Sequence, residues 1–247
     1  MWYGMKNYLP GPYMLDHLIE LRKRALLVLL VFAGFCCLYF VFSDDIFNAL
    51  VRPLRVVLPK NSTLIATHLT SVVLTPLSLA MDFASISTAP VALFHLWRFV
   101  LPGLYAREKR FSQALLLASF LLFCLGLAFC FYGVLPFMFR FFAASVPTHV
   151  KLLPDMRDAL GFISHMLLLF GLSFQLPLLC LALVRLEWLE LASLRKIRPY
   201  VIVGAFIIGM VLTPPDVFSQ ISLAIPLCLL YELGILLAQA MATFLKT

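Results

Sequence analysis

Long apolar runs constrain this chain more than any motif does. Residues 25–42 contain 18 positions without a charge, and longer, mostly apolar runs follow at 72–99, 114–139 and 161–184. Such runs cannot all be buried inside a soluble domain of 247 residues, 63% of them hydrophobic, but each is long enough to cross a bilayer. Lipid offers the backbone no hydrogen-bond partner, so only helices or a closed barrel can span it. Without period-2 alternation, the runs predict an all-α membrane protein.

The C-terminal part predicts two further, shorter spans. Residues 200–212 form an apolar run of about 20 Å as a helix, against a hydrocarbon core of about 30 Å. A Thr-Pro-Pro-Asp turn follows at 213–216, and residues 217–237 return across the membrane. Pro199 would occupy the first turn of the helix, after a charged loop at 185–198. The whole chain, 1–247, is then one domain of six transmembrane helices, and the short pair either thins the membrane or forms a re-entrant hairpin.

Two polar segments separate the first three spans. Residues 43–71 carry Ile46, Leu50 and Leu54 at near-helical spacing, which predicts a short amphipathic helix along the outer surface. Residues 99–110 form the next loop, because Pro102 disfavours helix at the residue before it. Glu108 stands in that loop among three basic residues. Its carboxylate is either neutralised by these neighbours or kept for a cationic partner.

The distribution of basic residues predicts the orientation. Thirteen of the 19 lysines and arginines lie in the N-terminal segment, the loops at 98–110 and 185–198, and the C-terminal tail. The positive-inside rule therefore places both termini in the cytoplasm, as for an inner-membrane protein. The net charge of +7 follows from these loops, so it does not indicate a nucleic-acid partner.

Several polar side chains fall inside the predicted spans. Asp82 lies on one helix face with Ser78 and Ser85, where it is either functional or a protonated group that packs between helices. Gln175 needs a hydrogen-bond partner in lipid. That partner is either within the chain or on the helix of another subunit, and contact with a partner helix is the sharper prediction.

No catalytic or cofactor-binding pattern is present in the sequence. The six cysteines all lie in apolar runs without metal-ligand or CxxC spacing, and no Walker A, HExxH, GxGxxG or GxSxG motif occurs. Ser164 and His165 are adjacent, so on a helix they point apart and do not form a hydrolase pair. We therefore expect no enzyme, no cofactor and no metal site. A small secondary transporter is the alternative, but it should show related halves, and none is evident.

Three motifs closely resemble the TatC family, the multispanning receptor of the twin-arginine protein translocase. They are the stretch HLIELRKR at 17–24, the stretch FVLPGLYAREKR at 99–110, and RPY at 198–200 continuing to LTPPDVFSQ at 212–220. The resemblance implies a concave bundle of six helices that binds twin-arginine signal peptides. It also implies export of folded proteins with TatA and TatB, driven by the protonmotive force, in a complex that contains more than one copy of the chain.

The resemblance also implies roles for single residues. Glu20 and Glu108, with Arg22 and Phe99 nearby, would form the cytoplasmic signal-peptide site. Two guanidinium groups need carboxylates that they can bind bidentately. Pro53 and Asp216 match family positions in the outer loops, and the hairpin around Met210 matches the region that docks TatB. Where the family commonly has an intramembrane glutamate, this chain has Gln175, which cannot ionise.

The basic-residue count generates a topology prediction. Reporter fusions at Lys60 and at Pro154 should report the outer compartment, whereas fusions in the loops around Glu108 and Glu190 should report the cytoplasm. A cytoplasmic signal at Lys60 or Pro154 would contradict the six-span arrangement.

Overall fold

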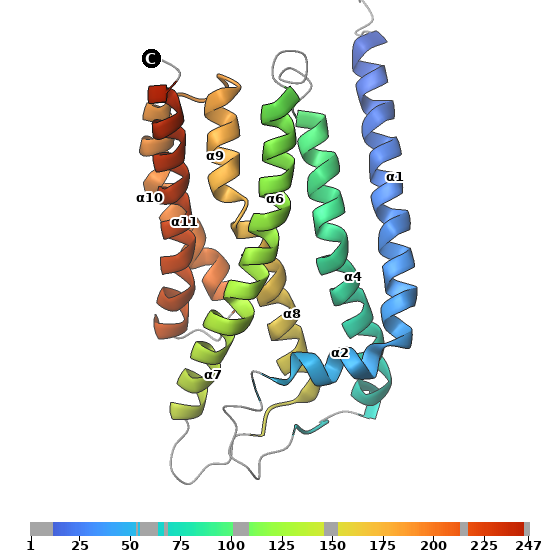
Figure 1. Cartoon of the computed structure of the whole chain (residues 1–247). Coiled ribbons are helices and arrows are strands. Elements are labelled where there is room, and N and C mark those ends of the chain that lie inside the picture. The colour runs from blue at the N-terminus through green and yellow to red at the C-terminus, as the bar shows by residue number, and fades with distance from the viewer. Residues whose placement is uncertain are drawn as a thin grey trace, which may run out of the picture.

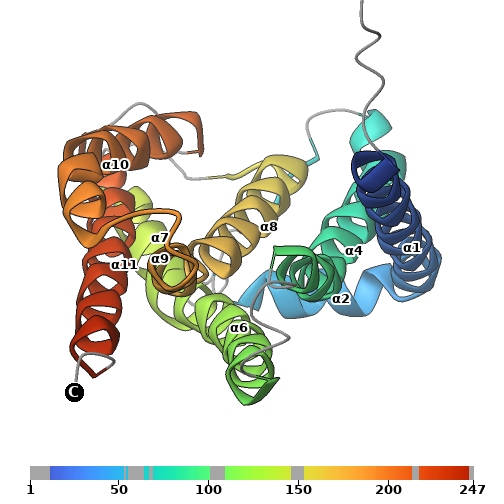
Figure 2. The same ribbon diagram turned by 90° about the horizontal axis from the view of Figure 1, so that it is seen from above.

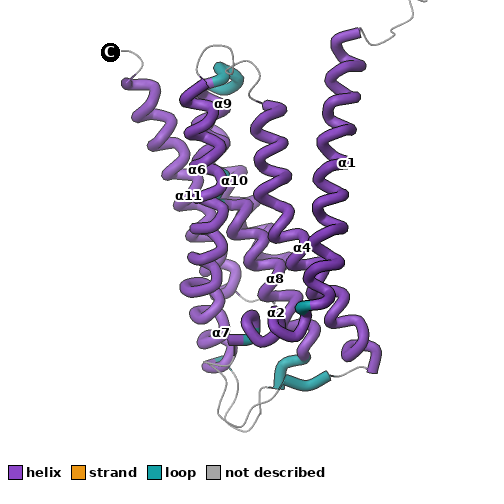
Figure 3. The backbone as a smooth tube through the Cα atoms, turned by 45° about the vertical axis from the view of Figure 1, so that its right-hand side comes forward, coloured by secondary structure: helices purple, strands orange, loops and turns teal. Residues whose placement is uncertain are grey.

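The computed structural model describes residues 12–52, 54, 64–66, 69–100, 109–145, 153–212 and 217–244. The regular elements of these residues are helices (Figure 3), and the only β-type pairing among them is an isolated bridge between Ile65 and Asp155. In chain order the helical elements are α1 (Pro12–Val41), α2 (Ser43–Leu50), α4 (Leu69–Val100), α6 (Lys109–Phe129), the π-helical turn η1 (Cys130–Val134), α7 (Leu135–Ala144), α8 (Met156–Ser173), α9 (Leu176–Arg185), α10 (Leu191–Leu212) and α11 (Val217–Phe244).

The prediction of a helical membrane protein is confirmed. Within the described residues, five stretches are long and apolar enough to cross a bilayer: Ile19–Val41, Leu74–Phe99, Gln113–Ala144, Met156–Arg185 and Gln220–Met241. The third of these runs without interruption from α6 through η1 into α7. A sixth crossing by residues 200–212 stays a prediction.

The start of α10 differs from the expectation. The helix begins at Leu191, so most of the predicted charged loop is helical and Pro199 lies in the helix interior. Proline removes a backbone hydrogen bond there, but packing holds the preceding turn in place. Leu194 is buried against the Tyr231 and Ile235 side chains of α11, and the Tyr231 hydroxyl donates to the Leu194 carbonyl at 2.7 Å. Tertiary contacts therefore override the local proline signal.

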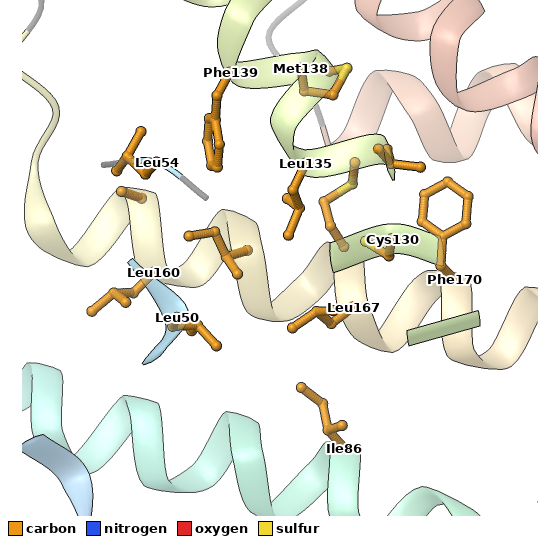
Figure 4. Packing of buried hydrophobic residues seen from close by; sticks show 14 of the residues in the cluster. Leu50, Leu54, Ile86, Cys130, Leu135, Met138, Phe139, Leu160, Leu167 and Phe170 are labelled. Carbon is orange, nitrogen blue, oxygen red and sulfur yellow. The ribbon is translucent and has the colours of Figure 1, made fainter. Parts of the chain in front are cut away.

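Both ends of the described chain lie at the same end of the bundle. Figure 1 shows the start of α1 and the end of α11 at its upper edge, and α2 lying across the lower edge. The predicted surface helix is thus present as α2, and Leu50, Val51 and Leu54 at its end are buried. They reach the main core beside α8, where Figure 4 shows Leu50 near Leu160.

Helix α8 lies in the middle of the bundle. It packs against α4 and α6, while α1 packs against α4 and α10 packs against α11. Figure 2 shows α8 between the α1–α4 pair and the α10–α11 pair. The fourth span breaks where α8 ends at Ser173 and α9 begins at Leu176, because Pro177 cannot donate to the preceding turn.

A glycine permits the close contact between α6 and α8. A Cβ atom added at Gly126 would stand 2.6 Å from the Phe170 carbonyl oxygen of α8, a backbone atom that cannot turn aside. Small residues at helix crossings allow backbones to approach in this way, and dispersion contacts then stabilise the pair. Gly126 therefore lets the α6 and α8 backbones meet at this crossing.

Replacing this glycine should separate the two helices. Gly126→Ala should lower the free energy of unfolding by about 1–3 kcal/mol, because the added methyl overpacks a backbone contact. Thermal unfolding of the detergent-solubilised protein measures the effect. Gly34→Ala is the matched control, since a Cβ atom there meets nothing within 4 Å. Equal midpoints for the two variants would contradict this account of the α6–α8 contact.

Candidate functional site

An arginine and a glutamate pair at the upper end of α1. Glu20 and Arg24 are four residues apart, a spacing that brings side chains together on one helix face. The Arg24 Nη2 atom donates to Glu20 Oε1, and its Nη1 atom donates to the His95 carbonyl oxygen of α4 at 3.1 Å. Arg24 therefore connects the Glu20 carboxylate to the neighbouring helix.

The ring of Phe99 completes this arrangement. The Arg24 Cζ atom lies 5.8 Å from the centroid of the ring, within the range of a cation–π contact. Only 17% of the Arg24 side chain is exposed, whereas 49% of the Glu20 side chain is. The guanidinium is thus enclosed by a carboxylate, a carbonyl and an aromatic face, while the carboxylate stays open to water. We call Glu20, Arg24, His95 and Phe99 the guanidinium site.

An apolar groove continues from the guanidinium site along the α1–α4 seam. Its volume is about 630 Å³, and Arg24, His95 and Phe99 line its polar end. The other lining residues are almost all apolar, and come from both helices: Leu21, Ala25, Val28, Leu29, Phe32, Ser85, Thr88, Ala89, Ala92 and Leu96. The groove suits an apolar segment, and the Glu20 carboxylate stands next to its polar end, paired with Arg24.

The structure places part of the predicted signal-peptide site. Glu20 and Phe99 both contact Arg24, so the structure brings these two predicted residues together. Arg22 is exposed on the same helix. Glu108, Pro53 and Asp216 lie outside the described residues.

Gln175 is paired within the chain. Its Oε1 atom accepts from the Ser119 hydroxyl at 2.8 Å, and its Nε2 atom donates to the Ser119 carbonyl oxygen at 2.9 Å. The indole of Trp97 donates to the same hydroxyl at 3.0 Å. This buried cluster joins α4, α6 and the α8–α9 break. Within α4, Trp97 precedes Phe99 by two residues. The intramolecular alternative therefore accounts for the amide, and partner contact at Gln175 stays a prediction without that support.

Other predicted residues lie on exposed surfaces or in a separate cavity. Met210 is 55% exposed, with several apolar neighbours on the same helix, α10. Glu232 of α11 forms an ion pair with Arg198 of α10 at 2.7 Å. Asp82 lines a cavity near the opposite end of the bundle from the guanidinium site. Among the described residues, no group of three potential metal ligands occurs.

Sequence reasoning did not single out Arg24, Trp97 or Ser119. The spacing of Glu20 and Arg24 was a usable signal, because opposite charges four residues apart on a helix commonly pair. No local sequence pattern indicates the contact between Trp97 and Ser119, because these residues are 22 positions apart and lie in different helices.

Comparisons with known proteins match nearly the whole chain. The family model for the Sec-independent protein translocase protein (TatC) matches residues 16–226. The TatC proteins of Azotobacter chroococcum mcd 1 and Escherichia coli strain K12 are each 44% identical, over 223 and 226 residues. These alignments cover 89% and 90% of this chain, and 86% of either relative.

The fold also matches a solved structure. A crystal structure of the twin arginine translocase receptor TatC superimposes with a TM-score of 0.83 at 32% sequence identity. The match covers 91% of this chain and 98% of that one.

The Gln175 cluster generates a stability prediction. Gln175→Leu should lower the free energy of unfolding by about 1–2 kcal/mol, because it leaves the buried Ser119 carbonyl and hydroxyl without their amide partner. Thermal unfolding in detergent measures the loss. Gln239→Leu is the matched control, since that amide accepts from Arg195 on an exposed surface. A loss no larger at Gln175 than at Gln239 would show that the buried cluster contributes nothing particular.

Proposed function

This chain belongs to the TatC family of Sec-independent protein translocase proteins, and from that premise we propose that it binds twin-arginine signal peptides. It would act as the receptor of a complex that exports folded proteins using the protonmotive force. A family of translocase components is not a catalytic family, so the chain is a transport protein and not an enzyme. The same comparisons favour the receptor over a small secondary transporter.

The observation that carries the proposal is that the guanidinium site already holds a guanidinium. Glu20, the His95 carbonyl and the Phe99 ring surround the Arg24 side chain. A planar guanidinium forms two parallel hydrogen bonds with a carboxylate and stacks on aromatic faces, whereas an ammonium does neither as well. A client arginine can use the same groups, and a client lysine uses them poorly.

Binding requires Glu20 to change or share its partner. In the pair with Arg24, the Glu20 carboxylate is 49% exposed, so solvent screens its charge on that side. A client guanidinium would approach the carboxylate from this open side. Glu108 would supply the second carboxylate for the second client arginine, and the basic residues around both acids would repel clients that these carboxylates do not hold.

The apolar groove gives a place for the next part of the client. Export signals carry a basic segment followed by an apolar one. In the α1–α4 groove the polar end lies at Arg24, and the lining toward Phe32 is apolar. A peptide whose arginines bind at Glu20 would bury its apolar segment along this seam.

The chain would lie in the inner membrane, with both of its termini in the cytoplasm. Its six crossings would form a concave bundle. TatB would dock on the exposed face of α10 around Met210, where Val203, Phe206 and Ile207 are also exposed. TatA would join the same complex, which contains more than one copy of this chain. Pro53 and Asp216 would act in the outer loops.

The two acids provide the test. Glu20→Ala and Glu108→Ala should each reduce crosslinking to a twin-arginine precursor by tenfold or more, because removing one partner of a desolvated charge pair costs about 2–5 kcal/mol. A precursor with Lys-Lys in place of Arg-Arg should bind the unmodified chain poorly. Site-specific photocrosslinking in membrane vesicles measures both effects.

Glu190→Ala is the matched control, since Glu190 is exposed directly before α10, on the same predicted side, outside these motifs. Its crosslinking should equal that of the unmodified chain. If Glu20→Ala and Glu108→Ala also crosslink and export the precursor at the unmodified rate, these acids are not the receptor site.

A further inference from the structure

A groove of about 310 Å³ follows the seam between α10 and α11. Figure 2 shows this helix pair at one edge of the molecule. Ala205 of α10 packs into a cluster with Ala224 and Leu227 of α11, so the two helices are in contact along the seam. Most of the lining is apolar, and it includes three large side chains on the outward face: Ile202, Ile225 and Leu229. We call this the α10–α11 groove.

An ion pair forms one end of the α10–α11 groove. The Arg198 Nη2 atom donates to Glu232 Oε2 at 2.7 Å, and the two side chains are 42% and 44% exposed. A guanidinium has five N–H donors. Among the described residues Arg198 donates only to Glu232, and its Nε atom is buried without a partner. The guanidinium therefore keeps unused hydrogen-bonding capacity at the end of the groove.

This ion pair lies inside the membrane-spanning part of α11. Glu232 stands nine residues before the end of the span Gln220–Met241, which is about 14 Å along the helix. Charged side chains at such a depth are costly unless they are paired or meet another polar group. Glu232 neutralises Arg198, but the described residues do not enclose either side chain. A polar group from outside the chain would therefore lower the remaining cost.

A second arginine stands on the same seam, nearer the end of the bundle. Arg195 precedes Arg198 by three residues, so both lie on one face of α10. Its Nη2 atom donates to the Gln239 amide oxygen of α11 at 2.8 Å, two helical turns beyond Glu232. An amide carries no charge, so Arg195 keeps its full positive charge. Every charged residue in 191–200 is basic, and the seam thus has an excess of positive charge at this end.

We propose that this seam binds one anionic phospholipid, from the leaflet at the end of the bundle where α10 begins. The phosphate lies at Arg195, the ester carbonyl groups accept from Arg198, and one acyl chain fills the α10–α11 groove. Basic pockets between transmembrane helices bind anionic headgroups in this way. The excess positive charge favours an anionic headgroup over a zwitterionic one. The proposal does not depend on the signal-peptide site, and the proposed orientation serves only to name the leaflet as the cytoplasmic one.

The shape of the groove favours a lipid over the helix of a partner protein. A helix with its side chains is about 10–12 Å across, so it can lie over a groove between two touching helices but not in it. A single acyl chain can lie in such a groove. The surface proposed for TatB centres on Met210, which follows Arg198 by 12 residues, about 18 Å toward the other end of α10. The lipid and TatB can therefore be bound together.

Photolabelling of the full chain in detergent tests the site. The probe is phosphatidylglycerol with a diazirine on one acyl chain, and mass spectrometry of peptides locates the label. We expect labelling at 201–206 and 225–229 that excess unlabelled phosphatidylglycerol removes, whereas phosphatidylcholine with the same acyl chains does not. Arg195→Gln should raise the probe concentration for half-maximal labelling about fivefold, because each basic residue near the membrane surface contributes roughly that factor to the binding of anionic lipid.

Arg157→Gln is the matched control, with the same change at an exposed position in the first turn of α8, and it should leave the half-maximal concentration unchanged. Equal thermal unfolding midpoints confirm that both variants are folded. An equal shift in the two variants, removal of the label by phosphatidylcholine, or label spread evenly over the other helices would each overturn the proposal. Loss of the label on addition of TatB would show that a partner helix covers the groove, and would also overturn it. No signal peptide is present, so failure of the receptor assignment would be distinguishable.

Discussion

The hydrogen bonds among Trp97, Ser119 and Gln175 fix the relative positions of three helices in a setting that supplies no water. The Gln175 amide oxygen accepts from the Ser119 hydroxyl, and the amide nitrogen donates to the Ser119 carbonyl oxygen. The Trp97 indole donates to the same Ser119 hydroxyl. These bonds hold the last turns of α4 against α6 and against the break between α8 and α9. Phe99 follows Trp97 by two residues, so the position of the guanidinium site depends on a cluster buried behind it.

The core of the bundle is closed and tightly packed, whereas the guanidinium site is partly open to solvent. The core around Phe123, Phe170 and Leu135 is closed, and Gly126 lets two backbones meet there. At the head of α1 the Glu20 carboxylate is half exposed and bound to a side chain of its own helix. A receptor gains from this difference, because the rigid part holds the binding groups in place while their partners can exchange.

Sequence alone predicted the class of fold and most of the long helices, because lipid forces each apolar run to satisfy its own backbone. It did not predict the start of α10, where burial of Leu194 against Tyr231 outweighs the effect of Pro199. Nor could it choose between the alternatives for Gln175, because the answer depends on Ser119, 56 positions away. For the site, Glu20 and Phe99 were predicted from the resemblance to the TatC family, whereas the contact of Arg24 with the His95 carbonyl on α4 required the folded chain.

The break at Pro177 gives α9 a mechanical role. One side of α9 packs Leu178 and Ala182 against Trp97 and Leu115, while Cys180 packs against α11. On the α11 side, the Gly234 backbone comes so close to Pro177 that a Cβ atom would stand 3.0 Å from its Cα atom. The α10–α11 pair thus joins the rest of the bundle mainly through α11, which packs along α9 and also places Leu223 and Leu230 in the main core. Because α9 packs against Trp97 as well, a partner that displaces α10 and α11 would also displace the turn of α4 that bears Phe99.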